Sequence, residues 1–115
     1  MTAESSVFTK IINREIKADI IFEDDVCIAI HDLNPVAPTH ALLIPKKPIP
    51  MLSKASEEDH DILAHLMLSA NVVAAKLEIT DDFRLVINNG ASACQTVFHL
   101  HLHILGGRKF TWPPG

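Results

Sequence analysis

The sequence offers little that would place the protein outside a reducing compartment. Its 115 residues contain two cysteines, Cys27 and Cys94, and no Cys-X-X-Cys pair. Two cysteines are too few for a disulfide framework, and without a Cys-X-X-Cys pair the common thiol-based metal and redox motifs are missing. These features predict a protein of the reducing cytoplasm.

Long apolar runs and clusters of positive charge are also missing. No stretch approaches the roughly 18 consecutive apolar residues of a membrane-spanning helix, and the opening MTAESSVFTK has no pattern of a secretory signal. The 10 basic residues are outnumbered by 14 acidic ones, so that the formal net charge is −4. Because a nucleic-acid-binding surface needs clustered basic residues, we expect neither a nucleic acid nor a membrane as a partner.

What the sequence does contain fits one domain over residues 1–115, with residues 1–5 expected to be flexible. Apolar residues make up 48% of the chain, enough for a hydrophobic core. Periodicity and turn signals predict two helices and five strands, which together indicate an α+β fold with antiparallel pairing. The helices are expected over residues 5–16 and 56–79, and the strands on either side of the acidic turn 23–25 and at 40–44, 82–90 and 97–105.

The long predicted helix is apolar on two faces. Ser56 and Asp59 match the capping-box pattern at its start. A core face is predicted from the helical spacing of Leu63, Leu66, Met67, Ala70, Val73, Ala74 and Leu77. On the opposite face lie Leu68, Val72 and Ile79. Scattered apolar residues are common on protein surfaces, but a helix with two apolar faces is usually buried on both, so we expect a homodimer with this helix in its interface.

The segment VFHLHLHIL places His99, His101 and His103 at alternate positions. In a strand, alternate residues share one face, whereas on a helix this spacing would scatter the three rings around the axis. We therefore expect a strand with its imidazoles on one face. The intervening residues Phe98, Leu100, Leu102 and Ile104 should point into the core.

Two kinds of chemistry suit such a row of imidazoles. One is zinc binding by two of them with His40; all three cannot share one ion, because at about 3.3 Å per residue His99 and His103 start roughly 13 Å apart. The other is contact with an extended anion such as a phosphate ester. Since histidine titrates near pH 6.5, it can serve there as nucleophile, base or acid. The pattern favours this second interpretation, with no metal and no cofactor, over three exposed histidines without a role.

These residues also carry a family resemblance. HLHLHIL resembles the signature of the histidine triad superfamily, and FEDDVCIAIHDLNPVAPTHALLIPKK and VINNG…QTVFHLHLHILGGRKFTWPPG resemble the two halves of its fold. The likeness runs from Val7 to Gly115, and the WPPG ending is typical of the histidine triad nucleotide-binding proteins, which are purine nucleoside phosphoramidases. It implies a HIT-like fold with a five-stranded antiparallel sheet and two helices per subunit. It also implies a homodimer whose sheets join into one of ten strands, with the tail 106–115 near the partner's site.

The resemblance further implies a role for each matching residue. His101 aligns with the nucleophile that attacks the α-phosphorus, while His99 and His103 align with residues that orient it and contact the phosphate. His40 aligns with a histidine that hydrogen-bonds behind the nucleophile and fixes its tautomer, and Asp32 with the carboxylate that holds the ribose hydroxyls. Polar contacts near the phosphate are implied for Asn88 and Thr96, a nucleobase pocket for Val7, Phe8, Ile11, Ile16, Ile30 and Leu33, and an approach to the partner subunit's site for Trp112.

Some positions depart from the family pattern or receive no role. The loop before the triad is usually glycine-rich, but here Ala93 and Cys94 stand there. Cys94 is expected either to narrow the phosphate pocket or to add a thiol that oxidises. His60 and His65 are interpreted as solvated residues on the flank of the long helix, and His31 receives no role.

The predicted function is a nucleotide-binding hydrolase. It cleaves the P–N bond of purine nucleoside 5′-phosphoramidates through a nucleotidyl-histidine, with AMP, GMP or their amidates as ligands. Two alternatives stay open: a dinucleoside polyphosphate hydrolase, and a nucleotide-binding or interaction module with weak turnover.

Overall fold

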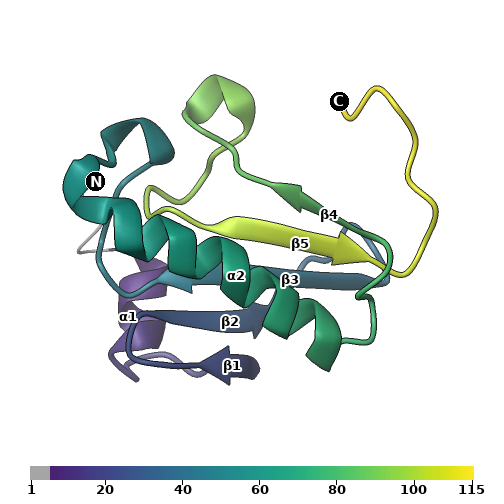
Figure 1. Cartoon of the computed structure of the whole chain (residues 1–115). Helices are drawn as coiled ribbons and strands as arrows, with labels where there is room; N and C mark the ends of the chain where they lie inside the picture. The colour runs from purple at the N-terminus through teal and green to yellow at the C-terminus, as the bar shows by residue number, and fades with distance from the viewer. Residues whose placement is uncertain (1–5) are drawn as a thin grey trace.

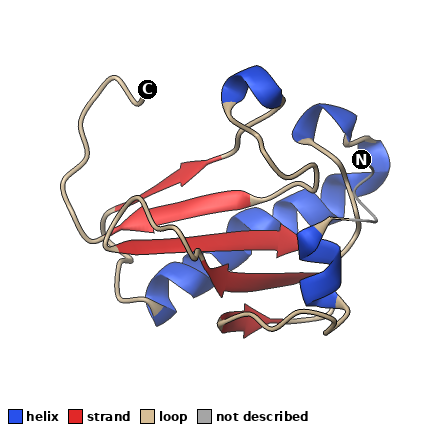
Figure 2. Ribbon diagram, turned by 180° about the vertical axis from the view of Figure 1, so that it is seen from behind, coloured by secondary structure: helices blue, strands red, loops and turns tan. Residues whose placement is uncertain are grey.

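The computed structural model describes residues 6–115 and contains one antiparallel sheet in the strand order β1-β2-β3-β5-β4. α2 covers the face of the sheet that is turned to the viewer in Figure 1, and α1 lies against the opposite face, which is turned to the viewer in Figure 2. This arrangement confirms the predicted α+β fold with five strands and two helices. The helices are α1 (Val7–Ile12) and α2 (His60–Lys76), and the strands are β1 (Ile20–Glu23), β2 (Cys27–His31), β3 (Thr39–Pro45), β4 (Phe83–Val86) and β5 (Leu102–Gly106).

The central strands are buried on both faces, and their side chains alternate between two hydrophobic clusters. In β2, Cys27 and Ala29 join the cluster under α2, whereas Ile28 and Ile30 join the cluster with Phe8 of α1. The same alternation continues in β3 and β5, since successive side chains of a strand point to opposite faces. Each face of the sheet therefore has its own apolar layer, and the histidines belong to the α1 side.

The long helix begins as predicted but exposes different residues. Ser56 and Asp59 form the expected capping box, at a 3-10 turn that precedes α2. Met67, predicted to be in the core, is 52% exposed, and its neighbours Leu68 and Val72 are exposed as well. The buried residues of the helix include Leu66, Ala70, Val73 and Ala74.

Ile79 is the second correction on this segment, because it packs against the core instead of lying on the outer face. The helix ends at Lys76 and the chain turns at Glu78, which has φ = 60°. The turn brings Ile79 over Gly106, where a Cβ atom would come within 2.8 Å of the Ile79 Cδ1 atom.

The strand predicted over 97–105 is regular only from Leu102 to Gly106. Residues 97–101 have no strand partner, because β3 pairs with β5 only as far as Leu43 and Leu102. Leu100 instead donates its backbone N–H to the Ile49 carbonyl, and both Leu100 and Leu102 still point into the core under α2. Phe98 is only partly buried, so the predicted alternation holds from Leu100 onward.

The predictions for the two ends of the chain have different outcomes. The flexibility predicted for residues 1–5 concerns residues outside the described part. α1 is shorter than predicted and ends at Ile12, and the tail after Gly107 runs along the outside of the molecule (Figure 1). Within residues 6–115, no helix is long and apolar enough to span a membrane.

Leu43 tests the importance of the α2-side core. Its side chain is fully buried in the central strand β3, so Leu43→Ala should lower the free energy of unfolding by about 2–5 kcal/mol through lost burial and a residual cavity. Leu33→Ala, at a position that is 89% exposed, is the control and should change it by less than about 0.5 kcal/mol. Urea unfolding at constant pH measures both, and equal effects would contradict this assignment of the core.

Candidate active site

A cavity of about 260 Å³ opens on the α1 side of the sheet, between α1, the β2–β3 connection and the segment that leads into β5. A larger and more open hollow of about 960 Å³ lies at the other end of β5, but it is lined by no histidine. The smaller cavity contains nine of the residues predicted for the site: Val7, Phe8, Ile11, Ile30, Asp32, Leu33, Thr96, His101 and His103. Its remaining lining comes from His31, Asn34, Leu42 and Val97.

His101 is held in one orientation and one tautomer. Its Nδ1 lies 2.7 Å from the backbone carbonyl oxygen of His99. A carbonyl oxygen only accepts hydrogen bonds, so Nδ1 carries the proton and Nε2 keeps its lone pair in the neutral ring. Burial lowers the pKa of His101 below its ordinary 6.5, and the edge of Phe8 packs against the ring. The result is a neutral imidazole with a free lone pair in the wall of the cavity.

His103 is oriented by a chain of hydrogen bonds that starts at the backbone. The N–H of Val36 donates to His40 Nδ1 at 3.1 Å, which places the His40 proton on Nε2. His40 Nε2 lies 2.9 Å from His103 Nδ1, so His40 donates and His103 accepts. His103 then carries its own proton on Nε2. Burial, followed by the nearby His101 and His40, lowers the pKa of His103 to about 4.

His40 therefore does not stand where the resemblance implied. It was expected behind the nucleophile His101, but it contacts His103 instead, and the His99 carbonyl fixes the tautomer of His101. The reason is register: in the β3–β5 pairing, Leu42 faces His103, and His40 lies one step diagonally along the same face. His40 is buried, and this burial lowers its pKa.

His99 is a supporting residue that faces away from the cavity. Its side chain is fully buried, and its Nε2 donates to the Pro45 carbonyl at 2.8 Å. The hydroxyls of Ser6 and Thr9 lie 3.3 and 3.4 Å from its Nδ1. The imidazole of His99 thus connects α1 to the end of β3 and does not line the cavity. Its backbone carbonyl is the group that hydrogen-bonds to His101.

Asp32 lies at the mouth of the cavity, directly after β2. One carboxylate oxygen accepts from the Asn34 N–H at 2.7 Å, closing a turn, and the other lies 3.4 Å from His40 Nε2. The side chain is 19% exposed. Asp32 therefore has two roles: it closes the turn after β2, and it places a carboxylate beside the cavity and His40.

Comparison with known proteins gives the family of the chain. Residues 13–110 match the HIT domain. The chain belongs to the HIT family. It is 66% identical over 113 residues to an uncharacterized HIT-like protein of Synechocystis, covering 98% of this chain and 99% of the relative. It is 46% identical over 112 residues to a maize 14 kDa zinc-binding protein, covering 96% and 88%. A HIT family hydrolase from Legionella pneumophila has 42% identity and a TM-score of 0.92, covering 95% and 98%.

Six residues predicted for this HIT site do not line its cavity: His40, His99, Ile16, Asn88, Cys94 and Trp112. Ile16 follows the end of α1 and is 42% exposed, because the helix stops four residues earlier than the prediction required. Trp112 is 81% exposed in the C-terminal tail, where its predicted contact would need a second subunit.

Cys94 occupies a left-handed backbone conformation with φ = 70° in the loop before the triad. Such a conformation is easy for glycine and costs other residues roughly 1–2 kcal/mol. The structure therefore gives a backbone reason why glycine suits this loop in the HIT family. The exposed thiol lies outside the cavity and does not narrow it.

Two residues that no sequence pattern assigned to the site, Gln95 and Ser6, hold this loop and the first helix in place. Gln95 is 3% exposed; its Oε1 accepts from the Gly90 N–H, and its Nε2 donates to the Pro50 and Val97 carbonyls. No local sequence pattern around Gln95 predicts these three hydrogen bonds. Ser6 was expected only as a helix cap, a role that it has, and its contact with His99 joins residues 93 positions apart.

One group of site residues has the composition of a metal site. The ligand atoms of Asp32, His40 and His103 all lie within 4.8 Å of one another. This group contains one strand histidine with His40 and a carboxylate, not the two strand histidines with His40 that the sequence suggested. A metal ion there would have to replace the His40–His103 hydrogen bond. The same three residues are satisfied as a hydrogen-bonded chain without an ion.

The depressed histidine pKa values predict a loss of stability in mild acid. As the pH falls, a histidine whose pKa is lower in the folded state is protonated first in the unfolded state. The full free energy of unfolding is therefore present above pH 6.5, and part of it is lost as the pH falls toward about 4. Urea unfolding should give a lower free energy at pH 5 than at pH 7. His103→Gln should reduce this difference by about 1 kcal/mol, discounted for the water-exposed part of the ring. An unchanged pH dependence would contradict the assignment.

Proposed function

We propose that this HIT protein is a purine nucleoside phosphoramidase of the histidine triad nucleotide-binding branch. The observation that carries the proposal is the His101 Nδ1–His99 carbonyl hydrogen bond, because it leaves the Nε2 lone pair of a neutral imidazole on the cavity side. The Legionella neighbour is called a HIT family hydrolase, which agrees with a hydrolytic reaction. A nitrogen nucleophile beside a hydrogen-bond donor suits displacement at phosphorus.

The reaction proceeds in two balanced steps. First, His101 Nε2 attacks the α-phosphorus, the P–N bond breaks, and its electron pair leaves with the amine nitrogen, which takes a proton from solvent. The His103 Nε2–H, aligned by His40, donates to a non-bridging phosphate oxygen and stabilises the charge that develops there. Second, water attacks the phosphorus of the nucleotidyl-histidine, the P–Nε2 bond breaks, and its pair returns to His101. The water supplies one oxygen to the nucleoside monophosphate and releases one proton.

The cavity supports a nucleoside monophosphate unit as the ligand. Its apolar end, with Phe8, Ile11 and Ile30, offers a dry surface for a base, and purines have the larger faces to bury. Asp32 stands between this end and the histidines, where a carboxylate can accept from two ribose hydroxyls. The order from base to ribose to phosphate thus follows the cavity from α1 to β5. Thr96 adds a hydroxyl near the phosphate end.

Two other activities remain alternatives. A dinucleoside polyphosphate hydrolase would use the same nucleophile on a P–O bond, and a binding module would hold the nucleotide without turnover. The maize relative is called zinc-binding, and the group Asp32, His40 and His103 has metal-ligand chemistry; a metal-dependent reaction would be lost in EDTA. A cytoplasmic location stays a prediction.

Hydrolysis of a fluorogenic adenosine 5′-phosphoramidate in EDTA is the first test. The protein should release the amine, and His101→Ala should lower kcat by about 10⁴-fold or more, as the loss of a nucleophile does. AMP binding and the circular dichroism spectrum should persist in the variant. The matched control is His60→Gln, at an exposed position of α2 that is far from the cavity.

Each alternative gives a different result. Faster cleavage of diadenosine polyphosphates than of the amidate would favour the polyphosphate hydrolase. AMP binding without any cleavage would favour the binding module, and loss of turnover in EDTA would favour the metal site. Full activity of His101→Ala would overturn the assignment of the nucleophile.

A second copy of the chain completes the proposed enzyme. Met67, Leu68 and Val72 form an apolar strip on the outer face of α2. β4 lies at the edge of the sheet with one side unpaired within the described residues, so a partner's β4 can extend the sheet to ten strands. Such a dimer would bring a partner's tail, including Trp112, toward the nucleotide cavity.

Leu68→Glu should dissociate this homodimer, because it places a charge in the apolar strip of both subunits. Sedimentation velocity should give a dimer for the parent protein and a monomer for the variant at the same concentration. Leu52→Glu, at a partly exposed position in a different segment, should remain a dimer. A monomeric parent protein would contradict the proposal.

A further inference from the structure

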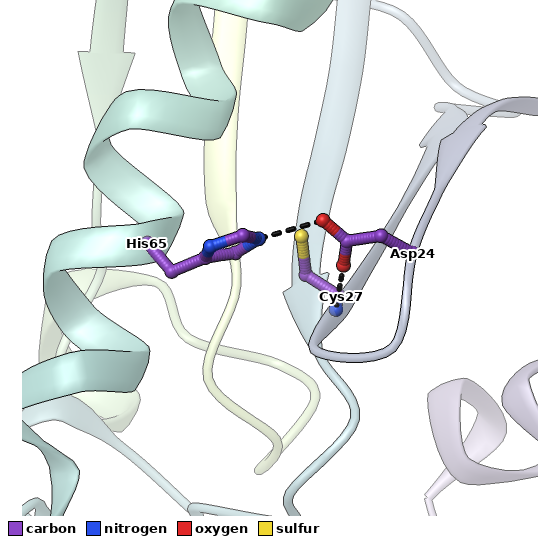
Figure 3. Close-up of side chains that lie close together, drawn as sticks. All are labelled: Asp24, Cys27 and His65. Carbon is purple, nitrogen blue, oxygen red and sulfur yellow. Dashed lines mark hydrogen bonds and ion pairs between the residues drawn. The ribbon is translucent and has the colours of Figure 1, made fainter.

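Three side chains with metal-binding chemistry meet on the opposite side of the sheet from the nucleotide cavity. Asp24 is in the turn between β1 and β2, Cys27 is the first residue of β2, and His65 is on α2. Figure 3 shows them converging in the space between helix and hairpin, with the His65 ring and the Cys27 sulfur both directed at the Asp24 carboxylate. One ligand atom from each residue lies within 4.8 Å of the other two.

The donor atoms are already oriented by the surrounding structure. The Oδ1 atom of Asp24 accepts from the backbone N–H groups of Val26 and Cys27 at 2.9 Å, which fixes the carboxylate and directs Oδ2 toward His65 Nε2, 2.6 Å away. The Ser69 hydroxyl, itself buried, hydrogen-bonds the Cys27 thiol. Outer contacts of this kind orient the ligands of metal sites.

An ion pair alone does not account for all three residues. The Asp24–His65 pair is partly exposed, with 31% and 40% of the side chains accessible, and pairs of that kind contribute little to stability. The Cys27 thiol lies beside the pair although it is fully buried and remains a free cysteine. A bound cation would displace the proton of this thiol and take the sulfur as a ligand.

We propose that Asp24, Cys27 and His65 form a binding site for a thiophilic divalent cation, of which Zn²⁺ is the best chemical fit. Thiolate, imidazole and carboxylate are the three ligand types of zinc. The thiolate and carboxylate together neutralise a 2+ charge, and a water molecule completes the tetrahedron. Neither calcium nor magnesium would select a sulfur ligand.

The geometry needs only a small adjustment. With bonds of about 2.0–2.3 Å, tetrahedral ligands lie roughly 3.3–3.8 Å apart, so the His65 Nε2–Asp24 Oδ2 contact has to widen by about 1 Å. Both side chains are partly exposed and can move, while the buried sulfur stays in place. Lys46, whose charge acts on Cys27, is paired with Glu23 at 2.9 Å and therefore does not repel the cation at full strength.

The site would join parts of the fold that are distant in sequence. His65 and Asp24 are 41 positions apart, so a bound ion clamps α2 to the β1–β2 hairpin. It touches no residue of the nucleotide cavity, because Cys27 points to the α2 side while its neighbours Ile28 and Ile30 point to the other. The cation site is thus independent of the proposed phosphoramidase activity.

Cobalt titration tests this site separately from the histidine cavity. A cysteine ligand gives Co²⁺ a sulfur-to-metal charge-transfer band in the near ultraviolet, which the sulfur-free group Asp32, His40 and His103 cannot produce. The titration is done on the full chain carrying Cys94→Ser, which removes the one exposed thiol. The expected result is a charge-transfer band that saturates at one equivalent of Co²⁺ and is abolished by added Zn²⁺.

Two further variants test whether Cys27 and His65 are ligands of the ion. Cys27→Ser should abolish the band, and His65→Gln should weaken Co²⁺ binding by at least about tenfold, the loss that even an outer-shell change can cause. His65 is partly exposed, so its variant retains the fold if the buried Cys27→Ser does not. His60→Gln on the same helix is the control and should bind as the parent does.

Thermal unfolding gives a second readout. Zn²⁺ should raise the Tm of the Cys94→Ser protein and of its His60→Gln variant, but less in the His65→Gln variant, because only binding to the folded state stabilises it. No charge-transfer band at excess Co²⁺ would overturn the proposal. A band that survives both Cys27→Ser and His65→Gln would also overturn it.

Discussion

The alternation of side chains along the paired strands β3 and β5 is the constraint on which the rest of the molecule depends. Because both faces of these strands are covered, each residue must suit either the apolar layer under α2 or the layer toward α1. Leu43, Leu102 and Ile104 fill the first. His40 and His103 fall on the second, where the sheet ends against the cavity. A shift of register by one residue would bury the imidazoles under α2 and remove the site.

Burial and hydrogen bonding together decide which ring nitrogen of each site histidine carries the proton. Burial lowers the pKa values of His40, His101 and His103, and in a neutral ring the position of the single proton decides what the other nitrogen can do. A backbone carbonyl determines this position for His101, and the Val36 N–H determines it for His40 and, through it, for His103. One ring is left with a lone pair at the cavity and its neighbour with a proton. The proposed reaction uses both.

The two faces of the sheet also separate two sorts of chemistry. The α1 side holds a hydrogen-bonded chain of histidines that is complete without an ion, and the α2 side holds a mixed set of oxygen, sulfur and nitrogen donors in Asp24, Cys27 and His65. The strand Cys27–His31 connects them, since its first residue faces α2 and Ile30 faces the cavity. An ion bound on the α2 side would lie at one end of the strand that carries part of the cavity, without contacting the cavity itself.

Hydrophobic periodicity and the HLHLHIL motif are local patterns, so the elements, their order and the row of histidines could be predicted from the sequence. The sequence also predicted the cap at Ser56 and the apolar positions of the cavity near α1. Only the tertiary structure decided that His40 pairs with His103, that His99 faces away from the cavity, and that His65 meets Asp24 rather than solvent. These contacts join residues 41 to 63 positions apart, and they depend on strand register and helix placement, which no local pattern specifies.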